Sequence, residues 1–250
     1  MVKHLSSRIV IVREQKTRNP MRSDVSAAAG RCPVLSRVSR VRREELVSHA
    51  RIVEYESGNS LYIHDEPADR CFVLLAGWVK LYRVRRTGEE AVIRVQTQGE
   101  AMGINDAMRN GRYSHHASAV TPSRAIVFPS QVVRKALRVD PNFGNVLLHH
   151  FLEVNDQLQD HIETLKSMKA IERLASFLQI HAEAQPNETV VTLPFDKATL
   201  ARYLGVQPES LSRALKKLSE YGVRAERSHI EITDIEALDA LTQRGKDTLG

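Results

Sequence analysis

The chain has 250 residues with a formal net charge of +6, and 42% of its residues are apolar. That length and apolar fraction suit one large or two small packed domains. No run of about 18 apolar residues occurs, which excludes a membrane-spanning helix, and no secretory leader is evident, so we expect a cytoplasmic protein. Two cysteines, Cys32 and Cys71, are too few for a four-cysteine zinc site or iron–sulfur cluster within one chain.

The positive charge is concentrated near the N-terminus. Residues 1–43 hold eleven Lys and Arg against two acidic residues, so the rest of the chain is slightly acidic. The net charge alone is therefore weak evidence for nucleic-acid binding. We expect residues 1–31 to form a basic tail, which is either a disordered arm or an extension upstream of a start at Met21.

Short apolar segments separated by glycine-containing turns fill residues 50–130. Residues 51–55 and 79–84 are examples of such segments, and Gly58 lies in one of the turns. This pattern predicts an all-β roll of the jelly-roll type. We expect the β-roll to occupy residues 32–140 and to serve as a sensor domain.

The spacing of the apolar residues changes in residues 141–169. There, mostly apolar side chains recur at alternating intervals of four and three residues. This a/d pattern predicts a helix about 42 Å long, at a rise of 1.5 Å per residue. Its seam favours self-pairing into a parallel homodimer, and the alternative is packing against the β-roll of the same chain. The seam residues are Leu147, Phe151, Val154, Leu158, His161, Leu165 and Met168.

Residues 170–250 have the pattern of a smaller helical domain with a wing. Glycines end two of the helical segments, and Pro208 starts one at a position that tolerates proline. The expected elements are helices at 171–181, 196–204 and 208–221, and wing strands at 223–227 and 229–232.

The segment from Leu200 to Leu218 has the spacing of a helix-turn-helix. On the second helix, Arg213 can donate two bonds to guanine, Glu209 can accept one from cytosine, and Ser212 can bond a base edge or a phosphate. The alternative is a solvated helix face on which the Glu and the Arg pair at i,i+4. Further DNA contacts, mostly to phosphates, are expected at Ser210, Arg202, Lys216, Lys217, Arg224 and Arg227.

With these motifs the chain resembles the Crp/Fnr family of bacterial regulators over nearly all of residues 32–245. The resemblance is carried by Arg173-Leu174-Ala175-x-Phe177-Leu178, Leu200-Ala201-x-x-Leu204-Gly205, Glu209-x-x-Ser212-Arg213, Tyr221-Gly222-Val223 and Ile230-x-Ile232-x-Asp234. It implies an α+β fold: a cyclic-nucleotide-binding-type β-roll, a long dimerisation helix and a C-terminal winged helix-turn-helix. In the Fnr-like branch, Glu-x-x-Ser-Arg reads TTGAT and ATCAA, which implies a similar inverted repeat here, TTGAT-N4-ATCAA.

The resemblance also locates an expected effector pocket at Gly99, Glu100, Gly103, His115 and His116. In cyclic-AMP-binding members an Arg-Ser pair grips the phosphate at the position of the two histidines. Without the Arg, a phosphate monoanion lacks its bidentate partner. We therefore do not expect cyclic AMP binding, and a cyclic-nucleotide-binding regulator is kept only as an alternative. The oxygen-sensing cysteine cluster of the family is absent from the sequence.

Two hypotheses for the signal stay open. One is a sensor of nitrogen oxides or low oxygen that uses haem, because residues 193–197 and 207–214 are similar to nitric-oxide-responsive regulators of denitrification. Haem-ligand candidates are His115, His116, His149, His150 and His161. The other is a regulator without an effector, set by its own expression level. In the predicted seam, His161 would either fix the helix register or act as a pH- or ligand-responsive switch.

Other classes of protein fit the sequence less well. A ligand-binding module outside transcription would leave residues 171–250 unexplained. An enzyme is not expected, because the sequence lacks a nucleophile elbow, a His-x-x-x-His metal pair and a phosphate loop. The expected partners are double-stranded DNA, a second copy of the chain and RNA polymerase.

Overall fold

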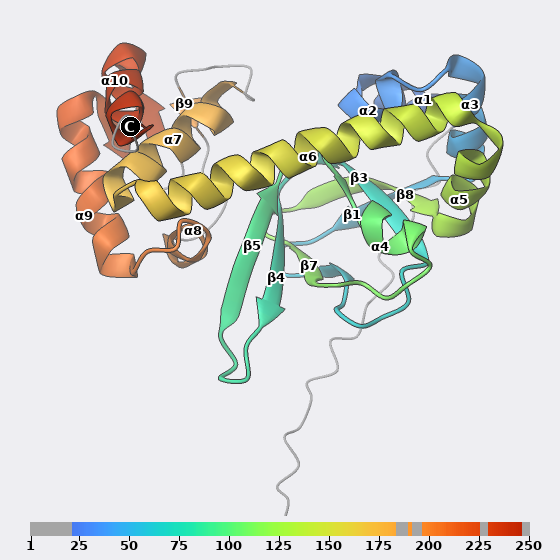
Figure 1. Ribbon diagram of the computed structural model, residues 1–250, viewed down its shortest axis with the longest axis horizontal. Helices are drawn as coiled ribbons and strands as arrows, with labels where there is room; N and C mark the ends of the chain where they lie inside the picture. The colour runs from blue at the N-terminus through green and yellow to red at the C-terminus, as the bar shows by residue number, and fades with distance from the viewer. Residues whose placement is uncertain (1–21, 184–189, 192–196, 226–229, 247–250) are drawn as a thin grey trace, which may run out of the picture. The chain divides into compact units, whose positions relative to one another are not determined.

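The computed structural model describes residues 22–183, 190–191, 197–225 and 230–246. Figure 1 shows their helices and strands coloured along the chain. The described residues form two compact units. The first contains residues up to Leu81 together with Gln96–Gly144, and the second contains Tyr82–Val95 together with residues from Asn145 onward.

The first unit is built on the expected β-roll. In the described part of the chain the strands of the roll form two four-stranded sheets, ordered β1-β8-β3-β6 and β2-β7-β4-β5, although residues 82–95 of β4 and β5 group with the second unit. Phe72, Leu74 and Ile126 are fully buried in the core. The strands are β1 Arg51–Tyr55, β2 Ser60–Tyr62, β3 Arg70–Ala76, β4 Val79–Val84, β5 Glu90–Gln96, β6 Ala101–Met102, β7 His116–Ala119 and β8 Ser123–Pro129.

From residue 22 onward, where the structure describes the chain, three helices precede the β-roll: α1 Arg22–Arg31, α2 Pro33–Ser36 and α3 Arg40–Ser48. The expectation of a tail is therefore wrong for residues 22–31. Alanine has the highest helix propensity, and Val25, Ala28 and Ala29 lie at helical spacing on one buried face. Residues 1–21 lie outside the described part of the chain.

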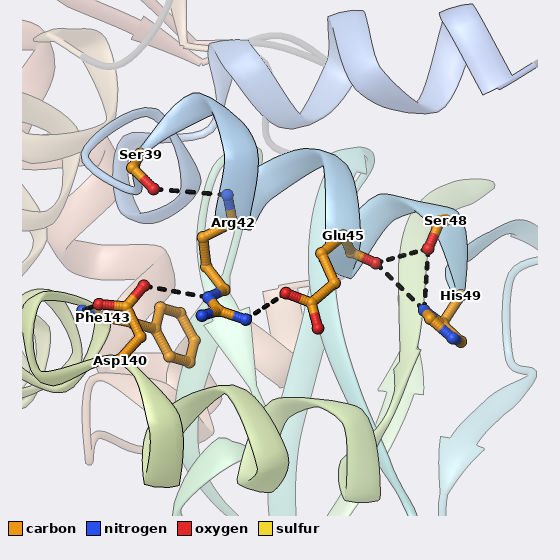
Figure 2. Close-up of polar contacts among 7 residues, drawn as sticks. All are labelled: Ser39, Arg42, Glu45, Ser48, His49, Asp140 and Phe143. Carbon is orange, nitrogen blue, oxygen red and sulfur yellow. Dashed lines mark hydrogen bonds and ion pairs between the residues drawn. The ribbon is translucent and has the colours of Figure 1, made fainter.

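An ion-pair network joins α3 to the junction of α5 (Ser130–Val139) and α6 (Pro141–Ser167), as Figure 2 shows. Arg42 Nε lies 3.0 Å from Asp140 Oδ2, and the Arg42 guanidinium also pairs with Glu45. Asp140 Oδ1 accepts hydrogen bonds from the amides of Asn142 at 3.0 Å and Phe143 at 3.2 Å, so it caps α6. The hydrogen bond from Arg42 and those capping bonds lower the pKa of the Asp140 carboxyl.

The second unit contains the rest of α6 and a helical domain with a three-stranded sheet ordered β10-β11-β9 among its described residues. Leu174, Leu200, Leu211 and Leu238 are fully buried in its core. Its further elements are α7 Ala170–Glu183, β9 Val190–Val191, α8 Lys197–Tyr203, α9 Pro208–Leu218, a 3-10 turn Ser219–Tyr221, β10 Val223–Ala225, β11 Ile230–Ile232 and α10 Ile235–Lys246. A short helix of the first unit, α4, spans Ile104–Met108.

The hairpin of residues 82–95 groups with the second unit, although the sequence placed it in the β-roll domain. Two contacts account for this: Arg94 donates a hydrogen bond to Gln157 of α6 at 2.6 Å, and Glu90 pairs with Arg202 of α8 at 3.5 Å. The hairpin therefore contacts both the long helix and the helix-turn-helix.

The helix expected over residues 141–169 is present as α6, but much of its predicted seam is covered within the chain. Leu147 is buried, and His161 stacks on Tyr203 of α8 with ring centroids 4.7 Å apart. Leu158 is 38% exposed. The most exposed apolar side chains of α6 lie on a neighbouring face: Leu148 at 56%, Leu152 at 51% and Ile162 at 51%. Among the described residues, no helix is long and apolar enough to cross a membrane.

We expect Arg42→Ala to lower the midpoint of thermal unfolding by about 2–6 °C, because it removes charge-assisted hydrogen bonds from a half-buried junction. Thermal unfolding followed by circular dichroism measures this. The matched control is Arg40→Ala, since Arg40 pairs with Glu44 on the same helix but its side chain is 84% exposed. An exposed pair contributes little, so this control should stay within about 1 °C of the parent. Equal effects of the two variants would contradict the network's role.

We also expect acid to destabilise the second unit through His181, which is buried beside Phe177. Burial lowers the pKa of His181 to about 4 from its ordinary 6.5. The unfolded chain therefore binds the proton first, and the free energy of unfolding falls by roughly 2 kcal/mol between pH 7 and pH 5. Urea unfolding at several pH values measures this slope.

The variant His181→Gln should lose that part of the pH dependence whatever its stability at pH 7. The matched variant His149→Gln, at an exposed histidine of α6, should keep it. An unchanged slope in His181→Gln would show that His181 is not the titrating group.

Candidate DNA-binding site

The site begins with two helices joined by a tight turn. Helix α8 ends at Tyr203, Gly205 turns the chain with φ +63°, and α9 starts at Pro208. A side chain at Gly205 would be strained by that backbone angle, and its Cβ would lie 3.2 Å from Cδ2 of Leu165. Proline suits the first turn of α9 because the amide it lacks would have no partner within the helix.

Helix α9 has one buried and one exposed face. Leu211, Leu215 and Leu218 are buried in the core of the second unit. Glu209, Ser212, Arg213, Lys216 and Lys217 are all exposed. The burial of the leucines fixes the rotation of the helix, so its polar edge faces outward near its N-terminus.

The exposed groups on this edge are only weakly engaged. Ser212 Oγ donates to the carbonyl oxygen of Pro208 at 3.0 Å, and Arg213 Nη2 donates to Ser210 Oγ at 3.3 Å. Within the described part of the chain, no ion pair joins Glu209 to Arg213, in contrast to the pair expected for an ordinary solvated face. The guanidinium and the carboxylate are therefore available for external partners.

Other expected phosphate-binding cations surround α9. Arg224 on β10 is exposed. Arg202 is also exposed but lies 3.5 Å from Glu90, in a surface pair that contributes little and can exchange for a phosphate. Arg227 lies outside the described residues.

Arg173 holds the turn in place, a role that the sequence did not reveal. Its guanidinium donates to the carbonyl oxygens of Leu165 at 2.5 Å, Met168 at 2.8 Å and Leu204 at 3.1 Å. These carbonyls belong to the end of α6 and to the turn after α8. One charged side chain thus ties the long helix to the helix-turn-helix. In the sequence Arg173 precedes the apolar residues Leu174 and Ala175, which is a weak signal for such an anchoring role.

The expected effector residues mainly make contacts within the β-roll. Gly99 and Gly103 adopt positive φ, and Glu100 Oε2 accepts from the amide of Thr97 at 2.7 Å. His115 Nε2 lies 2.9 Å from the hydroxyl of Tyr62. His116 Nδ1 accepts from the amide of His64 at 3.4 Å. In the described ranges, no group of three or more His, Cys, Asp or Glu is arranged to hold a metal ion.

Comparisons with known proteins agree with this architecture. The family model of the cyclic nucleotide-binding domain matches residues 52–140, and that of the Crp-like helix-turn-helix domain matches residues 172–241. A solved structure from Ruegeria pomeroyi, named for cyclic nucleotide binding, is 35% identical with a TM-score of 0.68; the alignment covers 90% of this chain and 99% of that one.

Regulators of nitrogen metabolism are also similar. The global nitrogen regulator of Synechococcus elongatus is 29% identical over 68% of this chain and 79% of its own length. The nitrogen fixation regulation protein FixK of Rhizobium meliloti is 27% identical over 76% of this chain and 82% of its own. With the fold, the two matched domains and these relatives in agreement, the chain belongs to the Crp/Fnr family of transcription regulators.

Proposed function

We propose that this regulator binds an inverted repeat similar to TTGAT-N4-ATCAA as a dimer and reads it with Glu209, Ser212 and Arg213. The observation that carries the proposal is the exposed polar edge of α9, whose opposite face is buried. A helix-turn-helix inserts this end of its second helix into the major groove. The remaining cations around α9 would contact phosphates.

The proposed half-site matches the chemistry of this edge. TTGAT contains a single G·C pair. Guanine offers O6 and N7 to an arginine, and the opposite cytosine offers its amino group to a carboxylate. Arg213 and Glu209, four residues apart on one helix, could therefore read the two bases of one pair. Ser212 lies between them in the sequence and could bond a neighbouring base edge or a phosphate.

The symmetry of the repeat requires two copies of α9 about one DNA turn apart. We propose that α6 supplies the dimer contact. The exposed side chains Leu148, Leu152 and Ile162, with Leu158 from the seam expected from the sequence, form the face most in need of a partner. Leu148 and Leu152 each follow a predicted seam residue by one position, which rotates the proposed face by about 100°.

For the signal we propose two candidates rather than cyclic AMP. The chain has His115 and His116 where the cyclic-AMP-binding members it resembles have Arg-Ser, and an imidazole lacks the forked donors with which a guanidinium holds a phosphate. The first candidate is the sensing of nitrogen oxides or of low oxygen through a bound haem. Control by protein level without an effector is the second. An absorption spectrum of haem-loaded protein, with and without nitric oxide, separates them: a Soret band that shifts supports the first.

The regulator would act in the cytoplasm. The DNA-bound dimer would either contact RNA polymerase and activate transcription, or block the polymerase and repress it.

We expect Arg213→Ala to lose about 1–3 kcal/mol of preference for TTGAT-N4-ATCAA over a duplex with both G·C pairs changed to A·T, because the guanine loses its bidentate partner. Fluorescence anisotropy at several salt concentrations measures both affinities. The matched variant Lys217→Ala removes an exposed cation from the same helix. It should weaken binding to both duplexes alike and reduce the salt slope. Unchanged preference in Arg213→Ala would remove its base-reading role.

We expect Leu152→Glu and Ile162→Glu to convert the dimer to a monomer, because a buried carboxylate at the interface would lack a partner. Sedimentation velocity at micromolar concentration measures the state. The control Asp160→Lys changes the charge on another exposed face of α6 and should leave the dimer intact. A dimer that survives Leu152→Glu and Ile162→Glu would place the interface elsewhere.

A further inference from the structure

A basic hollow lies at the start of α5 in the first unit. Its volume is about 500 Å³, and it is lined by His49, Arg51, Arg70 and Arg134 together with Asp69. Sites for small molecules usually occupy about 300–1,000 Å³. The hollow is therefore large enough for a small ligand, and its lining selects for negative charge.

Strand pairing explains why these arginines converge. Arg51 on β1 is opposite Val127 of β8, and Arg70 on β3 is opposite Pro129 of the same strand. The two arginines thus flank the end of β8, and α5, which carries Arg134, follows directly. The arrangement is built into the sheet rather than into a loop.

A second basic hollow of about 440 Å³ adjoins the first. Arg134 and Gln131 line both, and the second adds Lys135 and Arg138. Among all the lining residues, which belong to the described chain, Asp69 is the one acid. It lies 3.1 Å from Nε of Arg70, so its charge is compensated.

The cations differ in how firmly they are held. Arg134 is fixed, because its Nη1 donates to the carbonyl oxygen of Ala107 at 2.9 Å and to Ser130 Oγ at 3.0 Å. Arg51, Lys135 and Arg138 are exposed. None of their three side chains makes a hydrogen bond or ion pair with another described residue. The lining therefore combines a preorganised guanidinium with cations that are available to a ligand.

His49 adds a further polar group at the edge of the first hollow. Its Nδ1 lies 2.9 Å from Ser48 Oγ and 3.1 Å from the carbonyl oxygen of Glu45, as Figure 2 shows. These contacts orient the ring and leave Nε2 for a ligand.

We propose that these adjoining hollows form one binding site for a small anion that carries two or more phosphate groups. The five Arg and Lys residues of the lining exceed its one acid by four charges, so a single phosphate or carboxylate group would neutralise only part of them. Each phosphate group offers about 1.5–2 negative charges and three acceptor oxygens, which suit the forked donors of arginine. A linear polyphosphate chain extends from one hollow into the next. None of the residues expected to bind an effector lines either hollow.

Isothermal titration of the full-length protein with tripolyphosphate, at constant ionic strength and without DNA, tests the proposal. We expect saturable binding that Arg51→Ala and Arg138→Ala, one in each hollow, each weaken by about tenfold through loss of a charge-assisted bond. Arg124→Ala is the matched control, because Arg124 lies on β8 opposite Glu54, away from the hollows. Arg213→Ala controls for binding at the DNA-reading helix. Both control variants should bind tripolyphosphate like the parent.

Three results would overturn the proposal. The first is no saturable binding of tripolyphosphate below about 1 mM. The second is a loss in Arg124→Ala or Arg213→Ala equal to that in Arg51→Ala, which would indicate nonspecific attraction or binding at the DNA site. The third is citrate binding as tightly as tripolyphosphate, which would exclude a preference for phosphate. Because the DNA-binding variants are separate from the hollow variants, failure of this site leaves the proposed DNA recognition untouched.

Discussion

The burial of one face of α9 is the constraint on which DNA recognition depends. Leu211, Leu215 and Leu218 are held in the core, so the helix cannot rotate without exposing them to water. Their burial turns Glu209 and Arg213 outward. Among the described residues, the side chain of Arg213 bonds only to the hydroxyl of Ser210, so most of its hydrogen-bonding capacity is left for base edges. Packing thus creates the recognition surface, although the packed residues would never contact DNA.

The connection between α6 and the helix-turn-helix also depends on a few side-chain contacts. Arg173 bonds to backbone carbonyls at the end of α6 and after α8, and His161 stacks on Tyr203. Burial is the main cause that lowers the pKa of His161, and the nearby positive charges of Arg173 and Arg94 lower it further. The neutral form of the imidazole is therefore favoured in this stack. These contacts lie within one chain. Any signal that moved α6 would therefore also act on the turn that holds the recognition helix.

The sequence predicted the parts whose patterns are local. The short strands of the β-roll, the long helix and the helix–turn–helix with its glycine turn are all present. The helix over residues 22–31 was missed because a run of small residues is also typical of a disordered tail. The sequence does not show the elements that pack against this helix. The network of Arg42 and Asp140 joins residues almost a hundred positions apart, and the role of Arg173 depends on carbonyl groups. The heptad pattern of α6 located the helix, but neighbouring elements decide which of its faces is left exposed.

The claim that Arg213 reads the guanine of each half-site is tested most directly by changing one atom in each of these two guanines. Replacing both guanines with 7-deazaguanine removes the N7 acceptor and leaves base pairing intact. We expect the parent protein to bind this duplex more weakly than the natural one, and Arg213→Ala to bind both equally, because the lost atom and the lost side chain form one interaction. Equal losses in the parent and in Arg213→Ala would contradict the account.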